Sequence, residues 1–216
     1  MKKRGLIFDC DGTLVDSLGH ALESFNYALA EIGEGPRTVE EIKKYFGLGA
    51  DKIFTQLLGD SKKGLLAFEY YIDHQSKLAL DMKLHDGIRD LLNLAKSEEL
   101  LMGVVTGRHS RDMQLVLNPH QLTDYFQILV SDDHVQNSKP APDGIILAMN
   151  KMGLMPNEVC YIGDSIVDIQ AAHAAGCMAI AAVWDIHCKK EIMQTENPHF
   201  LASSPKDIWN FLINNN

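Results

Sequence analysis

The chain has few cysteines and no pattern among them. Its four cysteines include no CxxC pair and no regular spacing; they are Cys10, Cys160, Cys177 and Cys188. A structural zinc site needs paired thiolate or imidazole ligands, and a disulfide framework needs a regularly spaced set of cysteines. We therefore expect neither feature, and a reducing compartment fits this sequence better.

The sequence also lacks a cluster of basic residues and a long apolar run. It has 20 Lys and Arg residues against 29 Asp and Glu residues, and its formal net charge is −9, so we do not expect nucleic acid as a partner. No segment approaches the roughly 20 apolar residues needed to cross a bilayer. The run Leu6–Phe8 after the basic Met1–Arg4 is too short for a signal sequence. We expect no membrane partner and a cytoplasmic location.

Short apolar runs recur along the 216 residues and alternate with helical patterns. The runs are Gly5–Phe8, Leu100–Val105, Ile128–Val130, Val159–Ile162 and Met178–Val183. Between them, apolar residues recur at helical spacing, as at Ile166, Ile169 and Ala172. Strands that alternate with helices indicate a parallel sheet covered on both faces. We predict an α/β fold with a Rossmann-like, doubly wound parallel sheet.

Residues 16–82 interrupt this alternation. They show helical periodicity, for example at Leu22 and Phe25, and no convincing strand. We therefore predict that 16–82 form an all-helical domain. It is inserted into an α/β core domain made of residues 1–15 and 83–216.

Small polar clusters follow four of the apolar runs. They are Asp9 with Asp11, Thr106 with Gly107, Ser131–Asp133, and Gly163 with Asp164. In an open parallel sheet, ligands bind outside the carboxyl ends of the strands. We therefore expect these clusters to converge in space and to form one site.

The carboxylates in these clusters suggest a metal site. Asp9 and Asp11 are two residues apart, and in an extended segment such residues face the same way. Neighbouring carboxylates repel unless a cation or a shared proton separates them, and a hard divalent cation with oxygen ligands meets that need. Asp164 and Asp168 add carboxylates four residues apart, and Gly12 lets the chain turn tightly toward a ligand.

Other strand-end residues suit a phosphate group. Phosphoryl transfer needs a nucleophile, neutralisation of charge and a proton donor for the leaving oxygen. Thr106 and the amide of Gly107 can hydrogen-bond phosphate oxygens, and Lys139 can neutralise them as a point charge. Pro140 holds the loop that carries this lysine in an extended shape.

Four segments together resemble the motifs of the haloacid dehalogenase superfamily, in order and at suitable spacing. They are Asp9–Val15, Thr106 with Gly107, Lys139 with Pro140, and Gly163–Asp168. The resemblance runs from Leu6 to about Val183, and the helical insert is similar to the cap of the first subfamily. The segments Ser138–Asp143 and Gly47–Gly49 look like those of phosphoglycolate phosphatase-like members.

The resemblance implies an Mg²⁺-dependent phosphatase that hydrolyses a small phosphorylated metabolite. Asp9 would attack phosphorus and form an aspartyl-phosphate, and Asp11 would protonate the leaving alkoxide and then activate water. The Asp9 carboxylate, the Asp11 carbonyl and Asp164 would hold Mg²⁺. The resemblance also implies phosphate-binding and supporting residues, which are Thr106, Gly107, Lys139, Gly12 and Asp168.

A phosphomutase of the beta-phosphoglucomutase type is one alternative, because it shares the motifs and the cap. That class carries a histidine at the cap hinge and an arginine in the cap loop. Here His20 falls one position early, Ala50 stands where the arginine would be, and Lys52 follows two positions later.

A phospho-aspartate switch or binding module is an alternative from a different class. Receiver domains also combine a strand-end aspartate, Mg²⁺, a threonine and a lysine, but they have no helical insert. Asp11 is suited to discharge a phospho-enzyme, so its presence favours turnover over a stable phosphorylated state.

Overall fold

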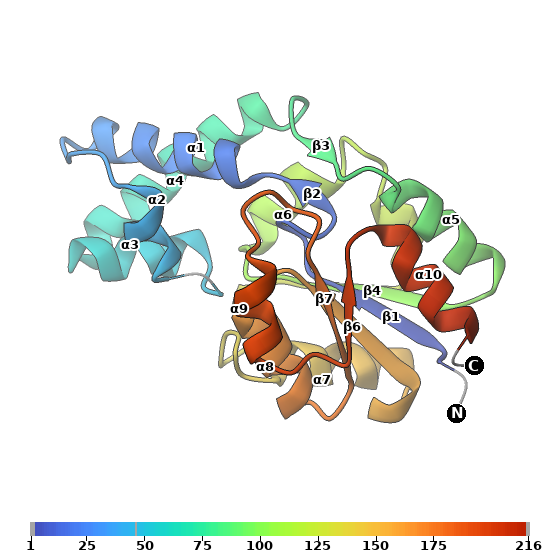
Figure 1. Ribbon diagram of the computed structural model, residues 1–216. Coiled ribbons are helices and arrows are strands. Elements are labelled where there is room, and N and C mark those ends of the chain that lie inside the picture. Colours follow the sequence, from blue (N-terminus) through green and yellow to red (C-terminus); the bar gives the residue numbers. More distant parts are fainter. Residues whose placement is uncertain (1–2, 46, 215–216) are drawn as a thin grey trace.

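The computed structural model describes residues 3–45 and 47–214, which contain a six-stranded parallel sheet (Figure 1). The strand order is β5-β4-β1-β6-β7-β8, and every neighbouring pair is parallel. The strands are β1 (Gly5–Phe8), β4 (Leu101–Val105), β5 (Ile128–Val130), β6 (Val159–Gly163), β7 (Met178–Ala182) and β8 (Phe200–Ala202). The chain runs outward from β1 on one side and from β6 on the other, so the strand order reverses between β1 and β6.

Helices cover both faces of this sheet. Successive side chains of a strand point to opposite faces, and the strands here are apolar on both, so each face is buried under helices. Leu6 and Phe8 of β1 pack into one apolar layer, whereas Ile7 packs into the other. The first layer includes α5 (Ile88–Ser97), α6 (Ser110–Leu117) and α10 (Pro205–Asn214). The second includes α7 (Asp143–Met152), α8 (Ile166–Ala174) and α9 (Lys190–Thr195). The predicted doubly wound α/β fold is confirmed.

The five predicted apolar runs are all strands, with ends that differ by at most one residue. Strand β8 was not predicted. It has three residues, Phe200–Ala202, and lies at the edge of the sheet beside β7. So short a segment carries no recognisable periodicity, and its pairing with β7 defines it as a strand.

Residues 18–78 form four helices, which we call the four-helix unit. They are α1 (Leu18–Glu31), α2 (Val39–Lys43), α3 (Ala50–Leu58) and α4 (Ser61–Leu78). The unit has its own apolar core, in which the ring of Phe25 lies 4.8 Å from the rings of both Phe54 and Tyr71. In Figure 1 the unit lies beyond the carboxyl end of β1, at the left of the view.

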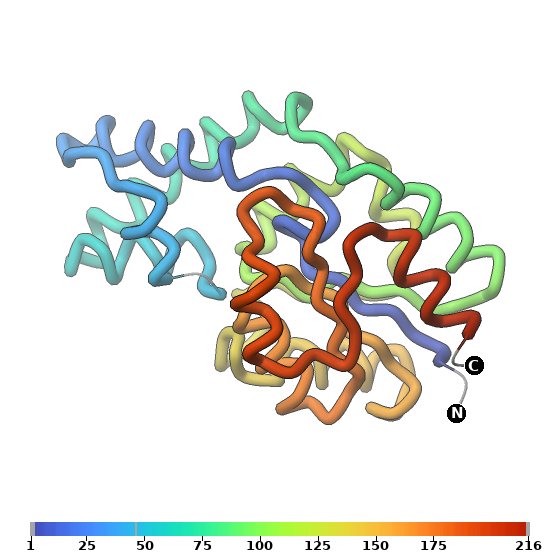
Figure 2. Tube along the Cα trace, in the orientation of Figure 1, coloured from blue at the N-terminus to red at the C-terminus, as the bar shows by residue number. Residues whose placement is uncertain are grey.

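Two short strands join the four-helix unit to the sheet domain. Strand β2 (Val15–Asp16) enters the unit and β3 (Lys83–Leu84) leaves it, and the two pair in antiparallel fashion. The trace in Figure 2 shows both crossings at the same end of α1 and α4. Asp16 therefore lies in a strand, and the prediction of helices alone for 16–82 was wrong at this residue.

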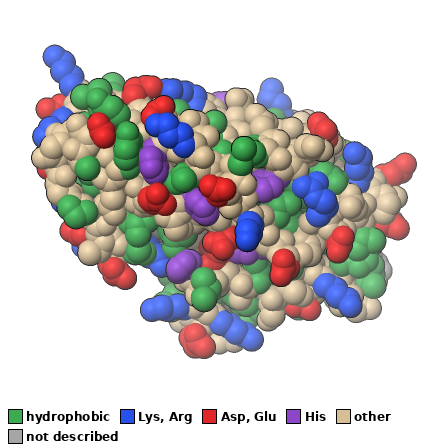
Figure 3. Space-filling view, turned by 90° about the horizontal axis from the view of Figure 1, so that it is seen from above, with side chains coloured by type: hydrophobic (Ala, Val, Ile, Leu, Met, Phe, Trp, Pro, Cys, Tyr) green, Lys and Arg blue, Asp and Glu red, His purple; other side chains and the backbone are tan. Residues whose placement is uncertain are grey.

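The surface carries charges of both signs. Acidic and basic side chains are interspersed over the face drawn in Figure 3. Among the helices of residues 3–45 and 47–214, none is long and apolar enough to cross a membrane.

Candidate active site

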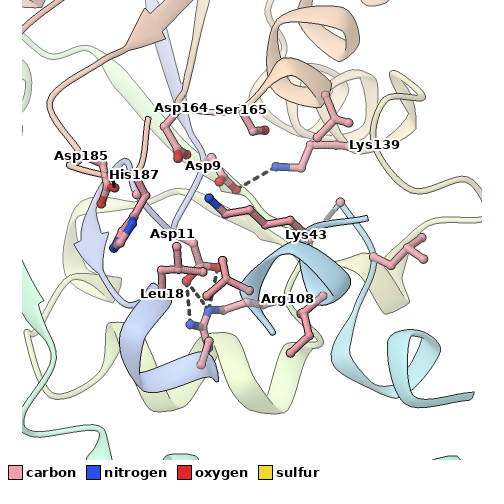
Figure 4. Close-up of a pocket in the computed structure, with 18 of the residues that line it drawn as sticks. Asp9, Asp11, Leu18, Lys43, Arg108, Lys139, Asp164, Ser165, Asp185 and His187 are labelled. Atoms are coloured by element: carbon pink, nitrogen blue, oxygen red, sulfur yellow. Dashed lines mark hydrogen bonds and ion pairs between the residues drawn. The ribbon is translucent and has the colours of Figure 1, made fainter. Parts of the chain in front are cut away.

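Asp9 directly follows β1 and lies in a buried cluster of charged groups. Its side chain is 9% exposed, and its Oδ1 accepts a hydrogen bond of 2.8 Å from Nζ of Lys139. The same ammonium donates to Oδ1 of Asp168 at 2.6 Å and to the hydroxyl of Tyr161 at 3.2 Å. Figure 4 shows Lys139 and Asp9 facing each other across this cluster. Lys139 is thus fixed beside the Asp9 carboxylate.

Three carboxylates in the cluster could hold a cation. Oxygen atoms of Asp9, Asp164 and Asp168 lie within 4.8 Å of one another. Both oxygens of Asp168 already accept hydrogen bonds, one from Lys139 and Tyr161 and the other from Ser165. Asp168 therefore orients Lys139 and the start of α8, which leaves Asp9 and Asp164 as the better cation ligands.

The pKa values of these carboxylates indicate that their charge is incompletely balanced. Burial raises the pKa of Asp9 to about 7, although Lys139 counteracts part of the shift. Burial, followed by the charges of Asp168 and Asp9, raises the pKa of Asp164 well above its ordinary value. Because a divalent cation would stabilise the charged forms, this oxygen-rich set fits Mg²⁺.

Asp11 faces a different partner. Its carboxylate accepts hydrogen bonds from Nε of Arg108 at 2.9 Å and 3.0 Å and from Nη2 at 2.6 Å. The hydroxyl of Ser17 also donates to it. Burial acts to raise the pKa of Asp11, but the bonds from Arg108 and Ser17 hold that pKa below its ordinary value. The site therefore places Asp9 beside Lys139 and Asp11 beside Arg108.

Two glycines let the backbone approach the site closely. Gly12 has a φ of 67°, and a Cβ there would overlap a carboxylate oxygen of Asp164. A Cβ on Gly107 would lie 3.1 Å from the backbone of Gly47 in the four-helix unit. Thr106 is buried, and its Oγ1 accepts a hydrogen bond of 3.2 Å from the backbone N–H of Arg108. Positions 12 and 107 therefore require glycine, because a side chain there would meet Asp164 or the backbone of Gly47.

A cavity of about 620 Å³ lies between the sheet domain and the four-helix unit. This volume is typical of small-molecule sites. One wall carries Asp9, Asp11, Gly12, Gly107, Lys139 and Asp164. The opposite wall comes from the four-helix unit and is mostly apolar, with Leu22, Phe25 and Ile42 among its residues. Lys43 of α2 also lines the cavity, and in Figure 4 its side chain extends toward Asp9 and Asp11.

The structure brings the predicted site residues together, although they differ in their contact with the cavity. Thr106 and Asp168 lie behind the wall, where they contact Arg108 and Lys139 respectively. Lys52, which follows two positions after the place of the phosphomutase arginine, forms an ion pair of 2.7 Å with Asp132.

Several site residues were not singled out from the sequence. They are Ser17, Lys43, Arg108, Asp112 and Tyr161. Arg108 directly follows Thr106 and Gly107, and this was the one available signal. An isolated arginine in a loop is usually exposed, so its burial could not be read from the sequence.

Comparison with known proteins agrees with this geometry. The family model described as haloacid dehalogenase-like hydrolase matches residues 6–182. A phosphoglycolate phosphatase of Xylella fastidiosa is 29% identical, covering 95% of this chain and 93% of its own length. One of Escherichia coli is 27% identical, covering 95% and 90%.

Solved structures share the fold. A hydrolase from Pseudomonas syringae superposes with a TM-score of 0.85 at 22% identity, covering 100% of this chain and 99% of its own. CbbY from Rhodobacter sphaeroides, solved in complex with phosphate, has a TM-score of 0.83 at 20% identity, covering 95% and 96%. At these identities the likeness establishes the fold alone.

Proposed function

The chain belongs to the haloacid dehalogenase-like hydrolases, and from that premise we propose that it hydrolyses a small phosphate monoester at the cavity beside Asp9. With relatives named phosphoglycolate phosphatase along 95% of its length, it is a phosphoric monoester hydrolase. The observation that carries the proposal is a buried carboxylate at the end of the central strand, held by a lysine and facing a cavity. A carboxylate that attacks phosphorus must face the bound phosphate, and a nearby cation such as Lys139 offsets the negative charge of the phosphate.

Asp9 is the proposed nucleophile. One of its oxygens forms a bond to phosphorus while the bond from phosphorus to the ester oxygen breaks, which produces an aspartyl-phosphate and an alkoxide. The ammonium of Lys139, 2.8 Å from Oδ1 of Asp9, neutralises charge on the transferred group. The amide of Gly107, which lines the cavity, donates a hydrogen bond to a phosphate oxygen, and Thr106 supports this loop from behind the wall through its bond with the N–H of Arg108.

Asp11 is the proposed acid and base. The ion pair with Arg108 favours the charged form of Asp11, so Asp11 takes up a proton from solvent before the transfer. That proton passes to the departing alkoxide, and the resulting carboxylate then takes a proton from the water that attacks phosphorus. The second step breaks the bond between Asp9 and phosphorus, releases inorganic phosphate and restores both side chains. Asp11 lines the cavity, so its carboxylate can reach a leaving group there.

Mg²⁺ fits the acidic side of the site. The Asp9 carboxylate, the backbone carbonyl of Asp11 and the Asp164 carboxylate would hold it, while Asp168 supports Lys139. When bound, Mg²⁺ would supply positive charge that offsets the charges of phosphate and of the buried carboxylates.

The four-helix unit is proposed to act as a cap domain spanning residues 16–82, with the remainder of the chain as the core domain. It supplies the apolar wall of the cavity and Lys43. A cap excludes bulk water during transfer and contacts the leaving group. Phosphoglycolate, which carries a carboxylate on its leaving group, is the first substrate to test, because Lys43 offers a positive charge there.

Steady-state turnover of p-nitrophenyl phosphate with Mg²⁺ tests the proposed function. We expect sustained release of phosphate, and a loss of at least about 1,000-fold in Asp9→Asn, because an amide is a poor nucleophile. Asp124→Asn, at an exposed aspartate of the 3₁₀ helix Thr123–Tyr125, is the matched control and should retain wild-type activity. A phosphorylated protein that accumulates without releasing phosphate would instead support the switch module.

A further inference from the structure

Arg108 lies in the loop between β4 and α6, and its side chain is only 4% exposed. It contacts two carboxylates, those of Asp11 and Asp112. A buried guanidinium is costly unless it is paired, so this pairing stabilises its position.

The contact with Asp11 fixes the orientation of that carboxylate. Nε and Nη2 of Arg108 donate to its two oxygens at 2.6–3.0 Å, in the two-point geometry that a planar guanidinium allows. The Asp11 side chain remains 40% exposed, although its arginine partner is buried. Arg108 therefore holds Asp11 from behind and leaves it accessible from the cavity.

Asp112 connects Arg108 to the four-helix unit. Nη1 of Arg108 lies 2.7 Å from Oδ1 of Asp112, and the other oxygen of Asp112 accepts a hydrogen bond of 3.1 Å from the hydroxyl of Tyr71. Tyr71 belongs to α4, and its ring packs between those of Phe25 and Phe68 in the core of that unit. One hydroxyl thus links the core of the helical unit to an ion pair of the sheet domain.

We propose that Arg108 is a positioning residue for Asp11, and that Asp112 and Tyr71 make this positioning depend on the placement of the four-helix unit. The inference rests on the proposed function, in which Asp11 protonates the leaving oxygen. A proton donor acts only when it lies within hydrogen-bond reach of that oxygen. Arg108 sets the direction of the Asp11 carboxylate, and Tyr71 restrains Arg108 when the unit is seated as in this structure.

Comparison of two aryl esters tests this role. Nitrophenolate is a weak base and leaves without a proton, whereas phenolate needs one, and the two esters have similar shapes. In Arg108→Lys, which keeps the charge but loses the two-point contact, we expect kcat/KM to fall about 30-fold for phenyl phosphate and about 3-fold for p-nitrophenyl phosphate. A general loss of folding would lower both values equally.

Tyr71→Phe provides a milder variant that keeps the packed ring. We expect the same selective loss at about 3- to 10-fold for phenyl phosphate, because one hydrogen bond to Asp112 is removed. Two controls match these changes at sites away from Asp11. Arg111→Lys alters a surface pair of 2.6 Å with Glu69 of α4, and Tyr125→Phe removes a hydroxyl that bonds Asn93. Both controls should resemble the wild type with both esters.

The outcomes separate this inference from the proposed function. Equal losses for the two esters in Arg108→Lys, or wild-type values in both Arg108→Lys and Tyr71→Phe, would overturn the positioning role while wild-type turnover stands. A Tyr71→Phe loss that Tyr125→Phe reproduces would also overturn it. A wild-type protein that hydrolyses neither ester would overturn the proposed function, and the inference with it.

Discussion

At the scale of single residues, the buried carboxylates near Asp9 carry more negative charge than Lys139 balances. Asp9 and Asp168 both contact the Lys139 ammonium, whereas Oδ1 of Asp164 accepts a hydrogen bond of 3.2 Å from the uncharged Thr13 hydroxyl. Repulsion among these carboxylates destabilises the metal-free protein and favours a bound cation. The melting temperature should therefore depend on Mg²⁺ and on the charge of Asp164.

The first prediction concerns Asp164→Asn and its response to Mg²⁺. With a chelator present, the variant should melt about 2–4 °C above the wild type, because about 1 kcal/mol of repulsion is removed. Mg²⁺ at about 100 times its dissociation constant should raise the wild-type melting temperature by roughly 5–10 °C. The variant should respond weakly, since it lacks one carboxylate ligand.

Thermal melting followed by circular dichroism measures these shifts without any assay of activity. Asp124→Asn is again the control, and it should respond to Mg²⁺ as the wild type does. Equal Mg²⁺ shifts in the wild type and in Asp164→Asn would exclude Asp164 as a ligand.

At the scale of elements, the start of α6 depends on a carboxylate from the 3₁₀ helix Asp132–His134. Asp133 accepts hydrogen bonds from the backbone N–H of Ser110 at 2.8 Å and from its hydroxyl at 2.7 Å. Partial burial opposes the charged form, but hydrogen bonds from Ser110 and Ser131 lower the pKa of Asp133 to about 2. The negative charge also lies at the positive end of the helix dipole.

The pH dependence of stability should report this contact. Because the folded-state pKa of Asp133, about 2, lies below the ordinary value of 3.8, its stabilisation is complete above about pH 4 and is lost as the pH falls toward 2. Asp133→Asn should lower the free energy of unfolding at pH 7 by about 1 kcal/mol, after allowance for solvent screening of a partly exposed group.

Urea unfolding of the two proteins at pH 7 and near pH 3 measures the effect. The difference between them should shrink at the lower pH, where the wild-type carboxylate begins to protonate. A difference that stays constant across this range would show that the charge of Asp133 contributes nothing to stability.

At the scale of the whole molecule, a buried aspartate of the sheet domain, Asp132, holds the four-helix unit beside the loop that carries Lys139. Asp132 is buried, accepts a hydrogen bond of 2.9 Å from the backbone N–H of Gly49, and pairs with Lys52 at 2.7 Å. Lys52 also donates to Oγ of Ser138 at 3.2 Å. These contacts seat the start of α3 next to the site.

Asp132→Ala should therefore weaken catalysis through the placement of the cap. We expect kcat/KM for p-nitrophenyl phosphate to fall about 10-fold, with changes in both kcat and KM, as in variants that alter closure of a lid. Glu69→Ala, which removes the surface pair with Arg111, is the control and should change these constants little.

Hydrogen exchange adds a second readout, since residues 50–58 of α3 should exchange faster in Asp132→Ala. Catalytic constants and exchange rates that match those of Glu69→Ala would show that Asp132 has no special part in seating the unit.

The sequence by itself determined the strands of the sheet, except the edge strand β8 and the short pair β2 and β3. It also determined the helical character of most of residues 16–82 and the convergence of Asp9, Lys139 and Asp164. The strands and helices could be predicted because their apolar patterns lie within each segment. The convergence of the three residues could be predicted because the carboxyl ends of parallel strands meet at one edge of the sheet.

Only the tertiary structure decided which charges pair. Arg108 binds Asp11 across 97 positions of the sequence, Lys52 binds Asp132 across 80, and Tyr71 reaches Asp112 across 41. Spacing along the chain carries no signal for such pairs, because the first joins two loops of the sheet domain and the other two depend on how the four-helix unit sits against that domain. The burial of Arg108 behind Asp11 follows from the packing of these loops, whereas Asp11 itself could be identified from the sequence.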